Sequence, residues 1–160
     1  MARQTAGQAR SLCQCAAFDF TPLRRYSRSM DTPSRKPPRE WFLQADYDMD
    51  TAGSMYRENR HFYAVFMCHL SIEKALKGLY LARKKEESPR VHSLMYLVDE
   101  MQLELPPELD AFLTRLNGLS IPTRYPDELR RMTMEYDAKR TNAVIEQSRK
   151  ALEWLKSQSR

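Results

Sequence analysis

Three side chains near the middle of the sequence are of the types that metal-free cleavage of RNA requires. Arg57, His61 and Tyr63 lie within seven consecutive residues. A histidine can act as general acid or base near neutral pH, and an arginine can stabilise the charge of a phosphate. If one helix includes both, Arg57 and His61 share a face. The alternative is a solvated helix start without a catalytic role.

Two lysines further along the chain are candidates for binding a phosphate. Lys74 and Lys77 are three residues apart, so a helix would bring both ammonium groups to one side. However, Glu73 stands four residues before Lys77, in the order that favours an ion pair within a helix. The spacing therefore indicates either a phosphate-binding pair or an ordinary helical ion pair.

His92, Arg124 and Tyr125 complete the set of candidate binding residues. His92 follows a joint that contains proline, where it could brace a helix start or serve as a ligand or acid–base group. Arg124 and Tyr125 lie between two prolines, in an extended turn that could direct them at a phosphate and a base. The alternative is a rigid turn in which Arg124 pairs with a carboxylate such as Glu73 or Asp48.

The element that must position most of these residues is a helix predicted from His61 to Lys85. Apolar or buried-type residues recur there at steps of three and four, namely Val65, His69, Ile72, Leu76 and Leu79. Charged residues interrupt the segment, so it does not fit a membrane span. We expect the central helix of a bundle, with His69 in the core or at a dimer interface.

Four further helices are predicted, at residues 40–56, 91–102, 107–116 and 136–157, because prolines and polar corners separate periodic segments. Residues 127–135 are ambiguous, a loop or one loose turn. The last helix is expected to bury a face with Tyr136, Ala143, Val144, Gln147, Ala151 and Trp154. No segment alternates as a strand does, so we predict an all-α, antiparallel up-and-down bundle of four to five helices.

Charge and cysteine content limit the classes of function. Residues 1–40 carry eight basic and three acidic side chains and so account for the whole net charge of +5. The remainder is neutral and shows no general signal for binding polyanions. Three cysteines without framework spacing favour a reducing, cytoplasmic location. We expect no metal and no cofactor.

Residues 1–39 are predicted to be a disordered, basic N-terminal extension ahead of a helical domain at 40–157. Arg, Ser, Gln and Thr are frequent there, and two prolines precede the first helix. Three interpretations remain open: an upstream extension or a wrongly assigned start codon, a functional tail, or a targeting segment.

Several of these motifs resemble those of the HEPN domain family (higher eukaryotes and prokaryotes nucleotide-binding domain). The segment Cys68–Leu79 is similar to the family's central helix. The joint from Pro89 through His92 to Leu97 resembles its Pro-x-x-His-x-Leu-x-x-Leu motif, and Arg124-Tyr125-Pro126 resembles its Arg-Tyr-Pro turn. With the first and last helices, the resemblance extends over residues 40–157.

The resemblance implies a helical bundle that forms a homodimer and often acts beside a minimal nucleotidyltransferase as a toxin–antitoxin pair. Some members are metal-independent ribonucleases with Arg, four to six residues, and then His. Arg57 and His61 have only three residues between them, and no His follows Arg124. We therefore expect a non-catalytic module that binds a nucleotide or RNA phosphate through Lys74, Lys77, His92, Arg124 and Tyr125. The alternatives are a ribonuclease and a purely structural interaction module.

Overall fold

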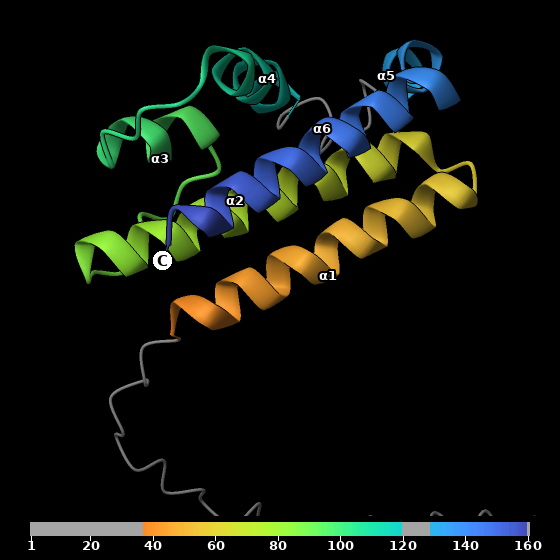
Figure 1. The fold of residues 1–160 in the computed structure, drawn as a ribbon. Coiled ribbons are helices and arrows are strands. Elements are labelled where there is room, and N and C mark those ends of the chain that lie inside the picture. Colours follow the sequence, from red (N-terminus) through yellow and green to blue (C-terminus); the bar gives the residue numbers. More distant parts are fainter. Residues whose placement is uncertain (1–36, 120–128, 160) are drawn as a thin grey trace, which may run out of the picture. The chain divides into compact units, whose positions relative to one another are not determined.

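The computed structural model describes residues 37–119 and 129–159, which form six helices and no strand. The helices are α1 (Pro38–Arg57), α2 (His61–Lys84), α3 (Leu94–Glu100), α4 (Pro107–Gly118), α5 (Leu129–Glu135) and α6 (Ala138–Ser157). The long helices α1, α2 and α6 run beside one another, and α3 and α4 lie over α2 (Figure 1). The predicted all-α bundle is thus confirmed.

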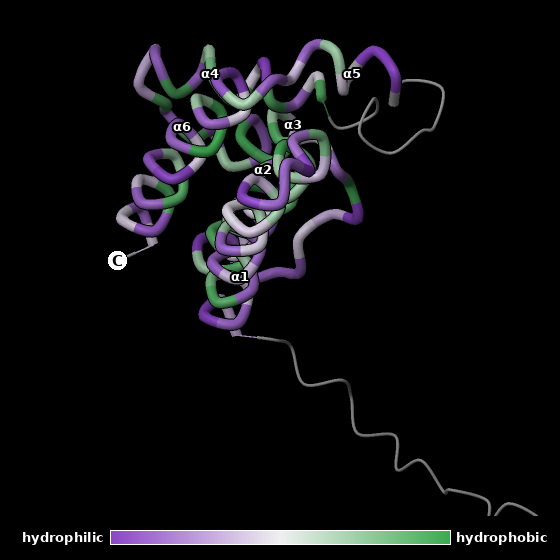
Figure 2. The backbone as a smooth tube through the Cα atoms, turned by 90° about the vertical axis from the view of Figure 1, so that its right-hand side faces the viewer, coloured by the Kyte–Doolittle hydropathy of each residue, from purple (hydrophilic) through white to green (hydrophobic). Residues whose placement is uncertain are grey.

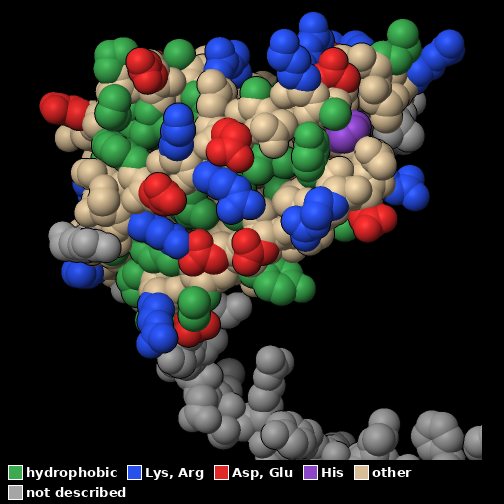
Figure 3. Space-filling view, turned by 45° about the vertical axis from the view of Figure 1, so that its right-hand side comes forward, with side chains coloured by type: hydrophobic (Ala, Val, Ile, Leu, Met, Phe, Trp, Pro, Cys, Tyr) green, Lys and Arg blue, Asp and Glu red, His purple; other side chains and the backbone are tan. Residues whose placement is uncertain are grey.

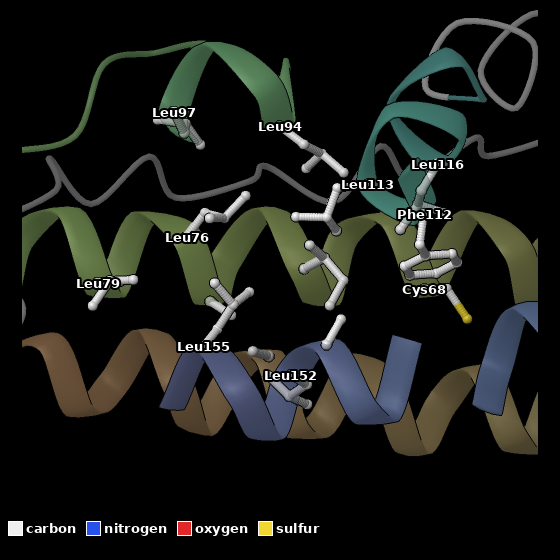
Figure 4. Close-up of a cluster of buried hydrophobic side chains, with 14 of the residues drawn as sticks. Cys68, Leu76, Leu79, Leu94, Leu97, Phe112, Leu113, Leu116, Leu152 and Leu155 are labelled. Carbon is white, nitrogen blue, oxygen red and sulfur yellow. The ribbon is translucent and has the colours of Figure 1, made fainter. Parts of the chain in front are cut away.

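α2 is the centre of the bundle, as its apolar spacing predicted. Fifteen of its 24 residues are buried, so it contacts neighbours on nearly every side. Its residues Ile72, Leu76 and Leu79 are fully buried, and they pack in the core with leucines of α3, α4 and α6 (Figure 4). By contrast, α1 and α6 change repeatedly between hydrophilic and hydrophobic residues, as amphipathic helices do (Figure 2).

The corner between α1 and α2 is a Schellman motif built without glycine. Asn59 has a φ of 56°, in the left-handed region. The Asn59 N–H donates to the Tyr56 carbonyl at 3.0 Å, and the Arg60 N–H donates to the Met55 carbonyl at 2.8 Å. These bonds satisfy carbonyls that the end of α1 would otherwise leave open. The chain then reverses, and α2 begins at His61.

Two close contacts fix the spacing of the antiparallel pair α1 and α2. A Cβ atom added at Gly78 would lie 2.9 Å from the Cβ of Trp41 and 3.3 Å from the Pro38 carbonyl oxygen. Nearer the middle, the buried Ser71 hydroxyl donates to the Ala45 carbonyl at 2.7 Å. A larger residue at Gly78 would therefore force the two backbones apart.

The buried face predicted for α6 was wrong by about one residue position. The face that packs into the core carries Thr141, Ile145, Ser148, Leu152 and Leu155, together with the predicted Ala151. Ala143 and Gln147 are exposed, and Val144 and Trp154 are half-buried. Thr141 and Ser148 are polar, so the sequence did not mark them as buried. The predicted face was therefore centred on the aromatic Trp154 instead.

Other element limits differ at helix ends. α3 begins at Leu94 rather than 91, because the Ser93 hydroxyl caps it by accepting from the Tyr96 N–H at 3.2 Å. α6 begins at Ala138, where Asp137 accepts from the Arg140 N–H at 2.8 Å. The ambiguous segment 127–135 contributes a sixth helix, α5. The predicted extension up to residue 36 and the Arg124-Tyr125 turn lie outside the described residues. In the part that is described, no helix has the length and apolar character to cross a membrane.

We expect the substitution Gly78→Ala to destabilise the protein. The added methyl group would overlap Trp41, and overpacking of this kind costs about 1–3 kcal/mol. That cost exceeds the gain of up to about 1 kcal/mol from the higher helix propensity of alanine. Urea unfolding monitored by circular dichroism measures the difference in free energy.

Gly53→Ala is the matched control on α1. Its Cβ would meet only the ends of two arginine side chains, at 3.4 and 3.5 Å, which can move. The propensity gain should then prevail and leave this variant as stable as the wild type or more so. Equal stability of the two variants would show that the approach at Gly78 does not limit packing.

Candidate functional site

A buried carboxylate on α2 gathers two of the predicted binding residues. Glu73 is 5% exposed. Its Oε1 accepts from the Lys77 ammonium at 2.8 Å, and Nδ1 of His92 lies 3.1 Å from both carboxylate oxygens. His92 belongs to the joint between α2 and α3, just before the cap residue Ser93. We call Glu73, Lys77 and His92 the Glu73 cluster.

The cluster keeps Glu73 ionised. Burial alone would raise the pKa of this carboxyl group. The hydrogen bonds and charges of Lys77 and His92 outweigh burial and lower the pKa from its usual value of 4.5. Lys77 is only 9% exposed, and its ammonium group is paired with Glu73.

Lys74, also on α2, is engaged in a similar way by a carboxylate of the neighbouring helix α1. Its ammonium group forms an ion pair with Asp48, which is 5% exposed and also accepts from the Gln44 amide at 3.4 Å. The ion pair therefore links α1 to α2. Lys74 itself keeps about a quarter of its side chain exposed. The structure brings Lys77 and His92 together on Glu73 and directs Lys74 to a different carboxylate.

Two further reactive side chains of α2 are buried in the core. His69 is fully buried, as predicted for a core histidine, and its Nδ1 lies 3.9 Å from the Glu73 carboxylate. Cys68 is also fully buried, and burial raises the pKa of its thiol to about 12. The thiol is therefore protonated at neutral pH and packs as a small apolar group.

The arrangement suggested for Arg57 and His61 is not formed. Arg57 belongs to the last turn of α1, where its guanidinium donates to the Ser54 hydroxyl at 2.9 Å. His61 is the first residue of α2, on the other side of the corner. The two residues therefore do not share one helical face. The sequence predicted a polar corner between the two helices, but it did not reveal the left-handed conformation of Asn59.

A cavity of about 640 Å³ opens beside this corner, and we call it the corner cavity. Residues around the start of α2 line one side, and α5 with the joint to α6 lines the other. The described residues in its lining are Asn59, Arg60, His61, Phe62, Tyr63, Arg130, Thr133 and Tyr136. Figure 3 shows Lys and Arg side chains near a histidine at one end of the molecule.

The charged side chains in the described lining of the corner cavity are basic. Arg60 and Arg130 are exposed and line it, whereas the described lining contains no Asp or Glu. Partial burial, followed by the charge of Glu135, raises the pKa of Tyr136, while Arg140, Arg115 and Arg131 act in the opposite direction. The Tyr136 hydroxyl therefore stays protonated and can donate a hydrogen bond.

The N-terminus of α2 adds to this positive field. No side chain of the described residues caps it, and the first N–H groups of a helix carry a partial positive charge. His61 packs against the ring of Tyr56 with 5.5 Å between centroids. Its Nδ1 is buried and has no hydrogen-bond partner among the described residues. Tyr63 is 48% exposed and presents an aromatic side chain at the cavity.

Sequence reasoning identified His61 and Tyr63 here but missed Arg60, Arg130 and Tyr136 as site residues. Arg60 directly precedes His61, so the local run of Arg, His and Tyr was a usable signal. Arg130 and Tyr136 carried no such signal, because they lie in and after a segment that was ambiguous between loop and helix. Where the structure is described, no group of His, Cys, Asp and Glu is arranged to hold a metal ion.

The fold and site define a class: an all-α bundle with a basic, aromatic cavity at the start of its central helix. The family model of the HEPN domain matches residues 38–158, so the chain belongs to the HEPN domain family. None of the curated proteins matches the chain.

Two solved structures share the fold. TT1696 from Thermus thermophilus has a TM-score of 0.66 and 24% identity, over 76% of this chain and 97% of that one. ST0689, described as an archaeal HEPN homologue, has a TM-score of 0.63 and 24% identity, over 79% of this chain and all of its own. At these identities the similarity concerns the fold alone.

We expect Glu73 to make stability depend on pH. Its folded-state pKa is lowered, so its contribution is complete above the usual pKa of 4.5 and is lost as the pH falls further. Glu73→Gln should lower stability at pH 7 by about 3 kcal/mol, because it leaves Lys77 buried without an opposite charge. The free energy of unfolding of the variant should also fall less steeply between pH 5 and pH 3 than that of the wild type. Urea unfolding at each pH measures this difference.

Glu86→Gln is the control, since Glu86 is an exposed carboxylate after the end of α2. It should leave both the stability and its pH dependence nearly unchanged. If Glu73→Gln showed the same profile as the control, the Glu73 cluster would not contribute measurably to stability.

Proposed function

We propose that this HEPN domain protein is a non-catalytic, homodimeric module that binds the phosphate of a nucleotide or RNA. We further propose that it acts with a minimal nucleotidyltransferase partner, as a toxin–antitoxin pair does. Membership of the HEPN family supports this proposal, because HEPN domains often dimerise. The cytoplasm is the compartment in which we expect it to act.

The observation that carries the proposal is the corner cavity. Arg60 and Arg130 approach it from different elements, so one phosphate could accept hydrogen bonds from both guanidinium groups. Tyr63 and Tyr136 supply aromatic rings on which a base can stack. Its volume of about 640 Å³ lies in the range of small-molecule sites. We therefore propose the corner cavity as the binding site.

The sequence-predicted residues offer a rival location. A phosphate there would have to compete with Glu73 for Lys77 and with Asp48 for Lys74, because both ion pairs already exist. The ring of His92 is 60% exposed, so it remains accessible to a ligand. The proposed roles of Lys74, Lys77 and His92, and those of Arg124 and Tyr125, thus provide the comparison for the binding experiment.

The positions of the histidines favour binding over cleavage. His69 is enclosed in the core, and His92 is held by Glu73. His61 alone borders the corner cavity among the three, and Arg57 lies on a separate helix. A general acid–base mechanism needs its groups within hydrogen-bond reach of the reacting atoms.

A second candidate function is metal-independent RNA cleavage, which one observation favours. Arg60, His61 and Tyr63 line the same cavity, so a cation and an imidazole would both meet a phosphodiester there. Incubating RNA with the protein in EDTA tests this alternative. We expect the RNA to stay intact; cleavage that His61→Ala abolishes would make the ribonuclease the better description.

The pairing and the partner have their own readouts. Light scattering on the full chain should give the mass of two copies, well above the 18.9 kDa of one. Co-expression with a small nucleotidyltransferase encoded beside it should yield a complex that survives purification. A monomer that recovers no such partner would leave only the binding part of the proposal.

For the binding itself, we expect Arg60→Ala and Arg130→Ala each to weaken the affinity for AMP by about tenfold or more. Each removes a charge-assisted hydrogen bond, which contributes about 1.5–3 kcal/mol. Isothermal titration calorimetry gives the dissociation constants, and amide shifts on titration show which residues respond.

Two variants serve as controls. Arg83 is exposed near the other end of α2, roughly 33 Å from His61 along the helix, so Arg83→Ala should bind as the wild type does. Lys74→Ala tests the rival location. Loss of binding in Lys74→Ala, with normal binding in Arg60→Ala, would move the site to the Glu73 cluster and its neighbours.

A further inference from the structure

We infer that the corner cavity takes a single nucleotide that ends in a phosphomonoester and binds it without a divalent cation. A nucleoside monophosphate and the phosphorylated end of an RNA strand share this chemistry. The inference rests on the proposed function and specifies its ligand. It follows from the charge, the hydrogen-bond donors and the rings that surround the cavity.

The charge of the site matches a phosphomonoester. Such a group carries about −1.5 to −2 at neutral pH, whereas an internal phosphodiester carries about −1. Arg60 and Arg130 supply two fixed positive charges. The uncapped start of α2 adds a partial positive charge beside Arg60. Two guanidinium groups and a helix end would thus neutralise a dianion, and a diester would leave part of this charge unbalanced.

The donors of the site come from two sides of the cavity. Arg60 belongs to the corner before α2, Arg130 to α5 and the Tyr136 hydroxyl to the joint before α6. A terminal phosphate has three free oxygens and can accept from donors on several sides. A diester has only two, and its chain must continue in both directions. The arrangement therefore favours a phosphate at the end of a molecule.

Binding without a metal rests on the two arginines, because their charges can balance one phosphate. Magnesium that accompanies a polyphosphate is usually held by one or two carboxylates of the protein. The described residues around the cavity supply guanidinium, hydroxyl, amide and imidazole groups and no carboxylate. The arginines can balance the charge of one phosphate, but the four charges of a triphosphate would exceed them.

The aromatic side chains account for the rest of the ligand. Tyr63 is exposed, and its ring meets that of Phe62 edge-on at 5.1 Å, which leaves a face of Tyr63 for another ring. Every base can stack on such a face, so we expect little discrimination between bases. A base and one phosphate together use both kinds of group in the cavity.

The experiment is a calorimetric titration of the full chain in EDTA with AMP, adenosine, inorganic phosphate and ATP. We expect AMP to bind at least tenfold more tightly than adenosine and more tightly than inorganic phosphate. Adding excess Mg²⁺ should not improve the affinity for AMP, and ATP with Mg²⁺ should bind no better than AMP. A short RNA with a 5′-phosphate is compared with the same RNA ending in a 5′-hydroxyl, and should bind at least tenfold more tightly.

Variants separate the two parts of the ligand. Arg130→Ala should reduce the difference in affinity between AMP and adenosine. Tyr63→Ala should lower the affinity for AMP to nearly that for inorganic phosphate. Circular dichroism confirms that each variant is folded, and both positions are exposed. Arg83→Ala should retain the whole pattern.

The outcomes distinguish this inference from the proposed function. If AMP and RNA bind but the terminal phosphate makes no difference, or if ATP with Mg²⁺ binds best and EDTA abolishes binding, this inference is wrong and the proposed function stands. If none of the nucleotides or RNAs binds, both are wrong. Tight binding of AMP alone would identify the free nucleotide as the source, and tight binding of the RNA alone would identify the strand end.

Discussion

The close approach of α1 to α2 is the constraint on which the rest of the structure depends. At one end Gly78 lets the backbones meet, because any Cβ there would overlap Trp41. In the middle Ser71 donates to the Ala45 carbonyl, and at the other end the left-handed Asn59 reverses the chain. Because α2 is held from both ends, its buried residues meet α3, α4 and α6 in one register. The packing of α1 against α2 also positions the Glu73 cluster and the α2 side of the corner cavity.

The paired helices use their charges in two ways. Along their shared length Asp48 and Glu73 are buried, and burial of a carboxylate is tolerated only with opposite charges at hand. Lys74 and Lys77 supply them, so these lysines contribute to packing and orientation. At the corner the residues are exposed to solvent, and Arg60 borders a cavity whose described lining holds no carboxylate. Basic residues that look alike in the sequence thus have different surroundings. Lys74 and Lys77 are paired with carboxylates, whereas Arg60 borders the corner cavity.

Features that leave a local pattern in the sequence could be predicted, whereas contacts between distant segments could not. The periodicity of Ile72, Leu76 and Leu79 revealed α2, since burial of one face leaves a regular mark. The end of α1 was predicted to within one residue, although Asn59 takes the left-handed conformation that glycine usually marks. The end of α3 was predicted two residues too late, where Gln102 is left-handed. The face of α6 was misassigned because Thr141 and Ser148 are buried. The corner cavity needs α5 beside the start of α2, a contact between distant segments that no local pattern contains.

Membership of the HEPN family settles the architecture and leaves the chemistry to the individual site. His61 and Arg57 follow each other closely in sequence, yet the Schellman corner assigns them to different helices. Cleavage requires an imidazole and a cation aligned on one phosphodiester, whereas binding requires only donors that converge on a phosphate. In the proposed site, such donors would come from Arg60 at the start of α2 and from Arg130 of α5. The geometry of this short turn therefore sets which of the two side chains borders the cavity, because His61 lines it and Arg57 is not among its described lining residues.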